Sequence, residues 1–130
     1  MSIKRALIVD SDQMILSFYE SFLEERHAQF DRVFVDNPYE AIKLIESEDF
    51  DIISTGFVMK YFPLSGIYLV GEFRKKNPKA PAIVLSGDIF TAKKEAEENG
   101  LTEKILFVAK PLSFDDLSRK IEDWLGVSPW

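Results

Sequence analysis

Cysteine is absent from the chain, and histidine occurs once, as His27. Without cysteine the protein cannot form a disulfide scaffold, a thiolate-bound zinc or iron–sulfur site, or a thiol nucleophile. One histidine cannot build a multi-histidine metal site. Because His27 follows a predicted helix, we expect it at the helix end or on the surface, rather than in a catalytic role.

Positive charge and long apolar runs are also scarce. The 16 basic and 22 acidic residues give a formal net charge of −6 at pH 7, which opposes binding to the phosphate backbone of nucleic acids. No apolar run approaches the roughly 18–20 residues of a membrane span, and the apolar part of the N-terminus is too short for a signal peptide. We therefore expect a cytoplasmic protein with no nucleic-acid or membrane partner.

The 130 residues are 46% hydrophobic and 29% charged, a composition typical of a globular protein. The length suits one domain, so residues 1–130 are predicted to form a single domain. Five short apolar runs lie between amphipathic stretches, and such runs are typical of strands covered on both faces. The predicted strands are 6–9, 32–35, 51–55, 81–85 and 105–108.

Apolar residues at helical spacing predict a helix after each strand. Asn37-Pro38 marks one helix start, with an asparagine cap and a proline in the first turn. Ser113 marks another, with Asp116 three residues later. Alternating strands and helices imply a parallel sheet with helices on both faces. We predict an α/β fold of the flavodoxin-like type, a three-layer αβα sandwich with strand order 2-1-3-4-5 and five helices.

Ligands of such sheets bind at the carboxyl ends of the strands, and short motifs lie there in this chain. Leu7-Ile8-Val9-Asp10 opens a helix, Ser86 ends the fourth strand and Lys110-Pro111 follows the fifth. Over nearly its whole length the chain resembles the receiver domain of two-component response regulators, which is CheY-like. In that family two acids after strand one and an aspartate ending strand three hold Mg²⁺, and the last aspartate accepts a phosphoryl group.

The resemblance assigns the remaining pocket positions residue by residue. Asp10 corresponds to the first acid, Ser86 to the hydroxyl on strand four, and Lys110 to the lysine on strand five. Phe107 corresponds to the aromatic switch position of the family. A cis bond before the proline that follows the lysine is also common in the family, which bears on Lys110-Pro111.

Two positions depart from the family pattern. Gly56 stands at the acceptor position and Ser11 at the second acid. Glycine offers no nucleophile, and no aspartate or glutamate occurs between Asp51 and Glu72. Thr55 points to the opposite face of its strand. The hydroxyl of Ser54, about 6.6 Å deeper, has no adjacent base. We therefore predict a degenerate receiver, a pseudo-receiver without aspartyl phosphorylation.

The loss of two acids changes the expected metal chemistry. Asp12 has two interpretations: it replaces the second acid, or Asp12 or Ser11 caps the first helix. An Asp10–Lys110 ion pair is expected without any metal, because the lysine alone can compensate one carboxylate. We expect at most weak Mg²⁺ binding, at Asp10 and Asp12, and no other cofactor.

The loop after the third strand is longer and more apolar than in the family. One interpretation is a lid or partner-binding patch that includes Tyr61 and Phe62. In the other, Phe57 and Met59 pack beneath the loop and only Tyr61 or Phe62 is exposed.

In the family, the fourth helix and fifth strand form the usual output face. Phe90 and Phe107 are therefore further candidates for partner contact, although Phe107 is equally well explained as a core residue.

The resemblance implies a non-enzymatic signalling module whose partner is a histidine kinase or another signalling protein. One alternative is an active phosphorelay response regulator with an atypical acceptor. Another is a flavodoxin-like cofactor binder, which the acidic segment Asp10-Ser11-Asp12 disfavours because it repels a phosphate.

Overall fold

Five parallel strands of five residues each form one sheet in the order β2-β1-β3-β4-β5. The computed structural model describes residues 5–28, 30–110 and 113–125. The order β2-β1-β3-β4-β5 is the one expected from the sequence, so the predicted α/β sandwich is confirmed. The strands are β1 (Arg5–Val9), β2 (Asp31–Val35), β3 (Ile52–Gly56), β4 (Ala82–Ser86) and β5 (Ile105–Ala109).

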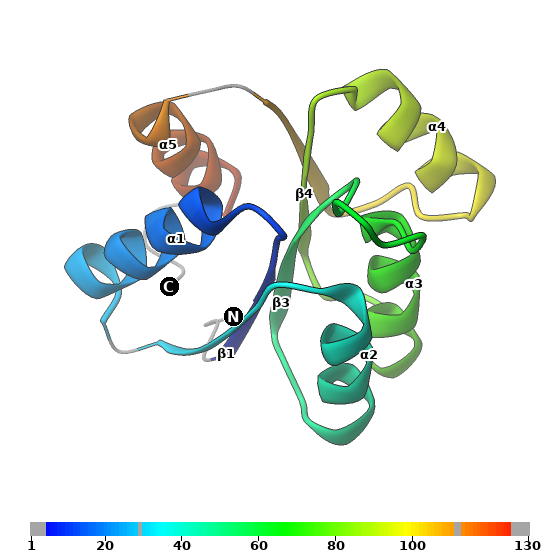
Figure 1. Ribbon diagram of the computed structural model, residues 1–130, viewed down its shortest axis with the longest axis horizontal. Coiled ribbons are helices and arrows are strands. Elements are labelled where there is room, and N and C mark those ends of the chain that lie inside the picture. Colours follow the sequence, from blue (N-terminus) through cyan, green and yellow to red (C-terminus); the bar gives the residue numbers. More distant parts are fainter. Residues whose placement is uncertain (1–4, 29, 111–112, 126–130) are drawn as a thin grey trace.

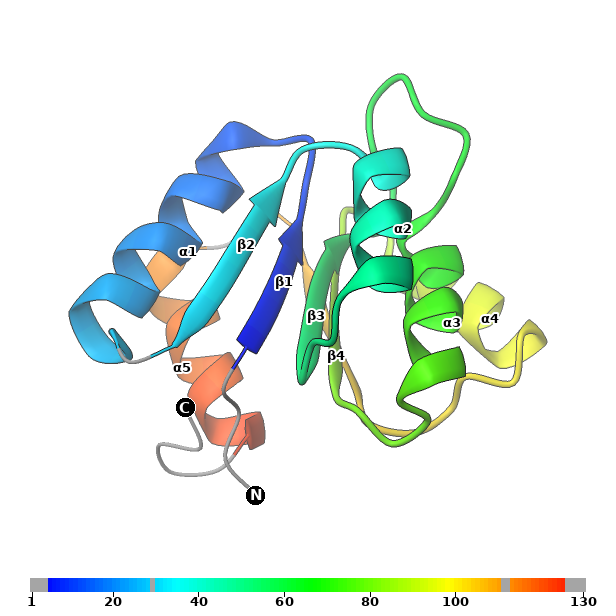
Figure 2. The ribbon, with the colours of Figure 1, turned by 90° about the horizontal axis from the view of Figure 1, so that it is seen from below.

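Five helices cover the two faces of the sheet, with α1 and α5 on one side and α2, α3 and α4 on the other (Figures 1 and 2). Two separate apolar clusters fill the spaces between these layers. Among the described residues, no helix is long and apolar enough to cross a bilayer. The helices are α1 (Gln13–Arg26), α2 (Pro38–Ser47), α3 (Gly66–Lys76), α4 (Ile89–Glu98) and α5 (Phe114–Leu125).

The strands are mostly apolar because the central ones are covered on both faces. In β1, Leu7 packs in the cluster beneath α2 and α3, and its neighbour Ile8 packs in the cluster beneath α1 and α5. Every residue of β3 and β4 is buried. The charged residues Asp10 and Lys110 stand directly after β1 and β5, where the backbone leaves the sheet.

A polar side chain accepts a hydrogen bond from the backbone at the start of each helix. The predicted caps are confirmed for α2, where Asn37 Oδ1 accepts from Glu40 N at 2.9 Å, and for α5, where Ser113 Oγ accepts from Asp116 N at 3.2 Å. These caps fix where each helix leaves the sheet. The cap residues are Asp12, Asn37, Ser65, Asp88 and Ser113.

His27 ends α1, as expected, but the alternative of a surface position is wrong. Its side chain is 4% exposed because α5 and neighbouring rings cover it. Nε2 lies 3.1 Å from a carboxylate oxygen of Glu122, and the ring lies edge-on to Phe22 with centroids 5.2 Å apart. His27 therefore joins the end of α1 to α5, far along the chain.

Candidate functional site

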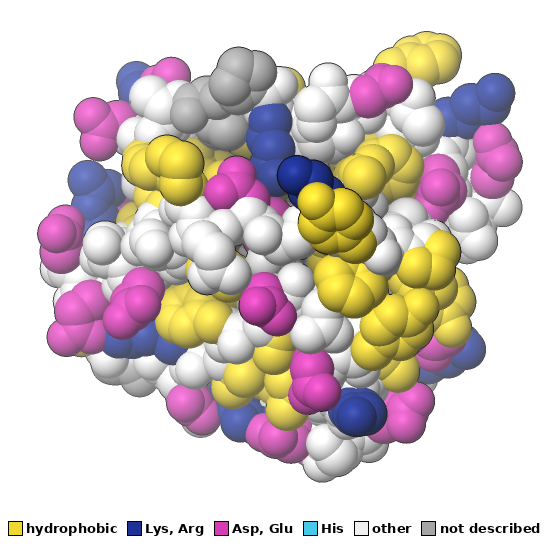
Figure 3. Space-filling view, in the orientation of Figure 1, with side chains coloured by type: hydrophobic (Ala, Val, Ile, Leu, Met, Phe, Trp, Pro, Cys, Tyr) yellow, Lys and Arg dark blue, Asp and Glu magenta, His cyan; other side chains and the backbone are white. Residues whose placement is uncertain are grey.

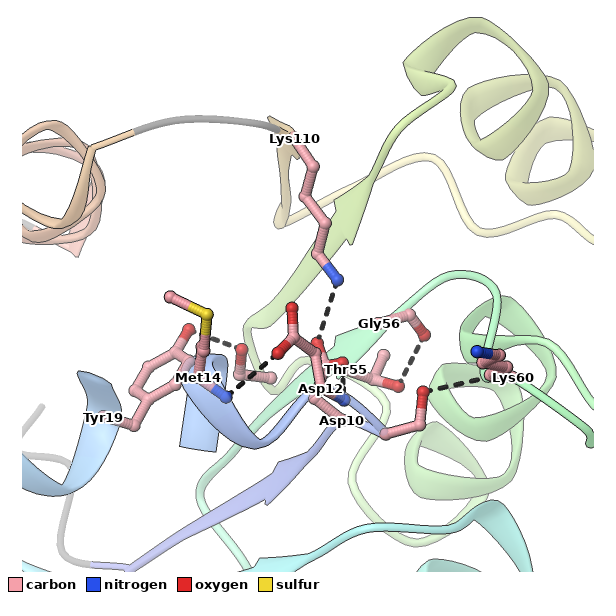
Figure 4. Close-up of polar contacts among 10 residues, drawn as sticks. Asp10, Asp12, Met14, Tyr19, Thr55, Gly56, Lys60 and Lys110 are labelled. Atoms are coloured by element: carbon pink, nitrogen blue, oxygen red, sulfur yellow. Dashed lines mark hydrogen bonds and ion pairs between the residues drawn. The ribbon is translucent and has the colours of Figure 1, made fainter. Parts of the chain in front are cut away.

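The carboxyl ends of β1, β3, β4 and β5 meet at one edge of the sheet. Asp10 follows β1, Gly56 ends β3, Ser86 ends β4 and Lys110 follows β5. Figure 4 shows Lys110 extending toward the carboxylate of Asp10, with Gly56 beside it. The structure thus brings together the four residues that the sequence placed at this edge.

Asp10 is the buried charge at the centre of the site, 1% exposed. Its Oδ1 accepts a hydrogen bond from the backbone N–H of Asp12 at 2.9 Å. Its Oδ2 lies 3.4 Å from the ammonium of Lys110, so the expected ion pair is present. Burial raises the pKa of Asp10, and the N–H of Asp12 and the charge of Lys110 oppose this rise without cancelling it.

Gly56 is packed directly against this carboxylate. A Cβ atom at position 56 would lie 3.0 Å from Oδ2 of Asp10 and 3.2 Å from its Cγ. Both separations are shorter than ordinary van der Waals contact. A Cβ atom at position 56 would therefore require the Asp10 side chain to shift by a few tenths of an ångström.

The hydroxyls next to Gly56 are held elsewhere. Ser54 is hydrogen-bonded to the phenol of Tyr19, on the α1 side of the sheet. Thr55 donates to the carbonyl of Gly56 at 2.9 Å, and its methyl group faces the start of α3. Burial raises the pKa of Tyr19, so its phenol stays neutral and is no base for Ser54.

Ser11 and Asp12 each have a structural partner. Asp12 Oδ1 accepts from the backbone N–H of Met14 at 2.9 Å, which confirms Asp12 as the cap of α1. The hydroxyl of Ser11 accepts from the backbone N–H of Lys60 at 3.1 Å. Ser11 therefore anchors the β3–α3 loop, a role that the sequence did not indicate.

The β4–α4 turn closes the other side of the site. Ser86 Oγ accepts from the backbone N–H of Asp88 at 2.9 Å, and the N–H of Lys110 donates to the Ser86 carbonyl at 2.8 Å. Pro111 lies outside the described residues, as does its bond to Lys110. A largely apolar pocket of about 410 Å³ opens here, lined by Phe57, Val58, Leu85, Ser86, Gly87, Asp88, Thr91 and Lys110.

Among the described residues, metal-ligating side chains do not gather at this edge. Within residues 5–28, 30–110 and 113–125, no group of three or more histidine, cysteine, aspartate or glutamate side chains is placed to hold an ion. Asp10 and Asp12 are two positions apart in the chain, but their oxygens accept hydrogen bonds from different backbone N–H groups.

The β3–α3 loop projects beyond the end of the sheet (Figure 2). Phe57 and Met59 are buried beneath it, whereas Val58 and Tyr61 are exposed. Phe62 is half-buried, and its ring lies edge-on to Tyr39 with centroids 5.9 Å apart. Figure 3 shows hydrophobic side chains gathered over this loop and over α2 and α3.

The two other candidate contact residues differ in burial. Phe90 is 79% exposed on α4. Phe107 is half-buried against the cluster beneath α2 and α3, and the ammonium of Lys93 lies 5.8 Å from its ring centroid. The packing of Phe107 favours its interpretation as a core residue.

Comparison with known families agrees with this architecture. The sequence model of one protein family, the response regulator receiver domain, matches residues 6–122. The chain belongs to this family. Receiver domains are signalling modules of two-component systems that interact with proteins such as kinases. No curated protein matches this receiver domain significantly.

Solved receiver structures superpose over almost the whole chain. A CheY-like receiver from Methanospirillum hungatei JF-1 is 26% identical, with a TM-score of 0.75, covering 95% of this chain and 94% of that one. The Francisella response regulator 1452 receiver is 30% identical, with a TM-score of 0.68 and coverages of 93% and 95%. The regulator TrrA of Thermotoga maritima, solved with Mg²⁺ and beryllofluoride, is 26% identical, with a TM-score of 0.71 and coverages of 95% and 100%.

Proposed function

We propose that this protein is a pseudo-receiver, which acts by contact with another protein and without aspartyl phosphorylation. Gly56 carries the proposal. It is the last residue of β3 and has no nucleophile, and the space above its Cα holds the carboxylate of Asp10. Phosphoryl transfer to a carboxylate needs an accessible oxygen, and Asp10 is 1% exposed.

The residues at the site also fit Mg²⁺ poorly. Mg²⁺ is bound through carboxylates that are free to coordinate it in octahedral geometry. Here Lys110 faces one oxygen of Asp10 and an N–H group faces the other, while Asp12 caps α1. A cation would have to displace the lysine, so we expect weak binding at Asp10 and Asp12.

The partner we propose is a histidine kinase or another signalling protein, and we propose that this receiver meets it in the cytoplasm. The receiver would occupy a binding surface on this partner without removing a phosphoryl group from it. Such a module serves as an adaptor or a decoy, because its surface is retained while the chemistry of its pocket is lost.

The test is an amide NMR titration with Mg²⁺ and then with beryllofluoride, which mimics an aspartyl phosphate. We expect no saturable shifts at Asp10, Gly56, Ser86 and Lys110. The same titration of the TrrA receiver, which binds Mg²⁺ and beryllofluoride, is the positive control. Saturable shifts that extend from the site to Phe107 would overturn the proposal in favour of an active phosphorelay receiver.

A further inference from the structure

The tip of the β3–α3 loop has a fixed shape. At its base, the N–H of Gly66 donates to the carbonyl of Phe57 at 2.8 Å, and in its middle the N–H of Lys60 donates to Ser11 at 3.1 Å. Met59 is fully buried beneath it. The loop therefore holds its exposed residues in place above the sheet.

Tyr61, at this tip, adopts a backbone conformation that disfavours a side chain. Its φ angle is 71°, in the left-handed region that costs an L-residue roughly 1–2 kcal/mol and that glycine adopts freely. The ring is 89% exposed, so burial within its own chain does not offset this cost. Strained residues of this kind concentrate at functional sites, which indicates a contact outside the chain.

A groove that could receive such a ring lies between α1 and α5. It measures about 470 Å³, and the aromatic rings of Phe18, Phe22 and Phe114 line it. The rings of Phe18 and Phe114 are stacked with centroids 4.9 Å apart. Met14, also in its lining, is 67% exposed. Of the apolar side chains that line it, Met14 and Phe114 are exposed, whereas Phe18 and Phe22 form its buried floor.

The charges of the tip and of the groove are opposite. At the tip, the ammonium of Lys60 lies 5.2 Å from the ring centroid of Tyr61. The groove is lined by the exposed acids Glu25 and Asp115, and its one arginine, Arg26, is ion-paired at 2.7 Å with an acid on α5. In a protein of net charge −6, a positive tip and an acidic groove favour one particular orientation of two copies.

We propose that the tip of the β3–α3 loop of one copy binds in the α1–α5 groove of a second copy. Tyr61 enters the groove against Phe18 and Phe114, and Lys60 faces the acidic groove residues. The contact joins two different surfaces, so each copy offers one tip and one groove. The association is independent of the pocket chemistry and goes beyond the proposed function.

Sedimentation velocity in EDTA, without any phosphodonor, tests this contact. A contact as small as one loop tip is expected to be weak, so the protein concentration should reach about 1 mM. The weight-average mass should rise above the 14.9 kDa of one chain as concentration increases. Added salt should lower it, because part of the attraction is between exposed charges.

Three variants locate the contact. Tyr61→Gly removes the ring and relieves the strained backbone, so it should stay folded and become monomeric. Met14→Lys places a positive charge in the groove and should also be monomeric. The control is Phe90→Ser, which removes an aromatic ring of similar exposure on α4 and should associate like the unaltered protein.

Mixing the two monomeric variants gives the decisive result. Tyr61→Gly retains its groove and Met14→Lys retains its tip, so the mixture should form a one-to-one complex that neither forms alone. A monomeric unaltered protein at every concentration would overturn the proposal, as would association that survives in Tyr61→Gly. If Met14→Lys fails to fold, as judged by circular dichroism, the Tyr61→Gly comparison decides alone. Binding of the tip only to a different protein would appear as a monomeric unaltered protein.

Discussion

The carboxylate of Asp10 lies 3.0 Å from the point at which a side chain on Gly56 would begin. Asp10 directly follows β1, and Gly56 ends the adjacent strand β3. The two residues are complementary in volume, because the side chain of Asp10 extends toward the space that Gly56 leaves empty. The absence of a side chain at position 56 is therefore part of the packing of this edge, and not an isolated change.

Gly56→Ala should destabilise the fold relative to a matched glycine substitution. Its Cβ must displace Asp10 by a few tenths of an ångström, whereas a Cβ at Gly87 meets no atom within 4 Å. Gly87→Ala should be neutral or stabilising by up to about 1 kcal/mol, because alanine lowers the entropy of the unfolded chain. Gly56→Ala should be less stable than Gly87→Ala by about 1–2 kcal/mol in urea denaturation. Equal stabilities would contradict the tight contact.

Gly56→Asp should cost more, because it adds a second carboxylate beside a buried one. Like charges at this separation repel, so we expect a loss of about 2–3 kcal/mol at neutral pH and a smaller loss near pH 4. Thermal unfolding at the two pH values measures the difference. A Gly56→Asp variant as stable as Gly56→Ala at neutral pH would show that Asp10 moves aside freely.

Asp10→Asn should change the pH dependence of stability in a defined direction. Burial raises the pKa of Asp10 above its ordinary value of 3.8, so the folded state binds a proton that the unfolded state has already released. Between the unfolded and the folded pKa, this group therefore lowers the free energy of unfolding as pH rises. Asparagine keeps an acceptor for the Asp12 N–H and does not titrate.

The stability of Asp10→Asn relative to the unaltered protein should therefore increase as pH rises from about 4 to neutrality. The measurement is urea denaturation across that range, with both proteins at the same ionic strength. Parallel curves for Asp10→Asn would contradict a raised pKa.

Ser11→Ala should loosen the β3–α3 loop. It removes the acceptor of the Lys60 N–H, an exposed hydrogen bond of 3.1 Å, and should cost about 0.5–1 kcal/mol. Hydrogen exchange at the Lys60 amide should accelerate, while the amide of Phe57, which donates to Leu85 at 2.8 Å, should exchange at its former rate. Unchanged exchange at Lys60 would show that buried Met59 alone holds the loop.

The strand order and the edge of the sheet where the site lies were predictable because both follow from repeated, local patterns. Apolar runs such as Ala6–Val9 indicate strands covered on both faces, and their alternation with helices leaves few topologies. The ends of parallel strands then meet at one edge. Asp10, Gly56, Ser86 and Lys110 could therefore be grouped together although up to 100 residues separate them.

The side-chain partners at that edge were not predictable in the same way. Ser11 binds a backbone N–H 49 residues further along the chain, and no pattern near Ser11 indicates this. The burial of His27 depends on α5, and the choice of Asp12 over Ser11 as the cap depends on where α1 begins. Such contacts depend on the tertiary arrangement, and single positions in a sequence do not encode it.

The buried pair of Tyr19 and Ser54 gives a final prediction. Their hydroxyls are hydrogen-bonded to each other in the layer between α1 and β3, directly below the site. Tyr19→Phe should leave the Ser54 hydroxyl without this partner in an apolar layer, at a cost of about 1–3 kcal/mol. Ser54→Ala should similarly leave the phenol of Tyr19 without its hydrogen-bond partner.

Removing both groups should then be less harmful than the two single losses added together. In the double variant, which combines Tyr19→Phe with Ser54→Ala, no polar group is left without a hydrogen-bond partner. Urea denaturation should therefore give a coupling energy of about 0.5–2 kcal/mol. Ser47→Ala, which removes an exposed hydroxyl bonded to the Lys43 carbonyl, is the control and should show no coupling to Tyr19→Phe. Additive losses at Tyr19 and Ser54 would mean that each hydroxyl finds another partner, such as a buried water, when the other is removed.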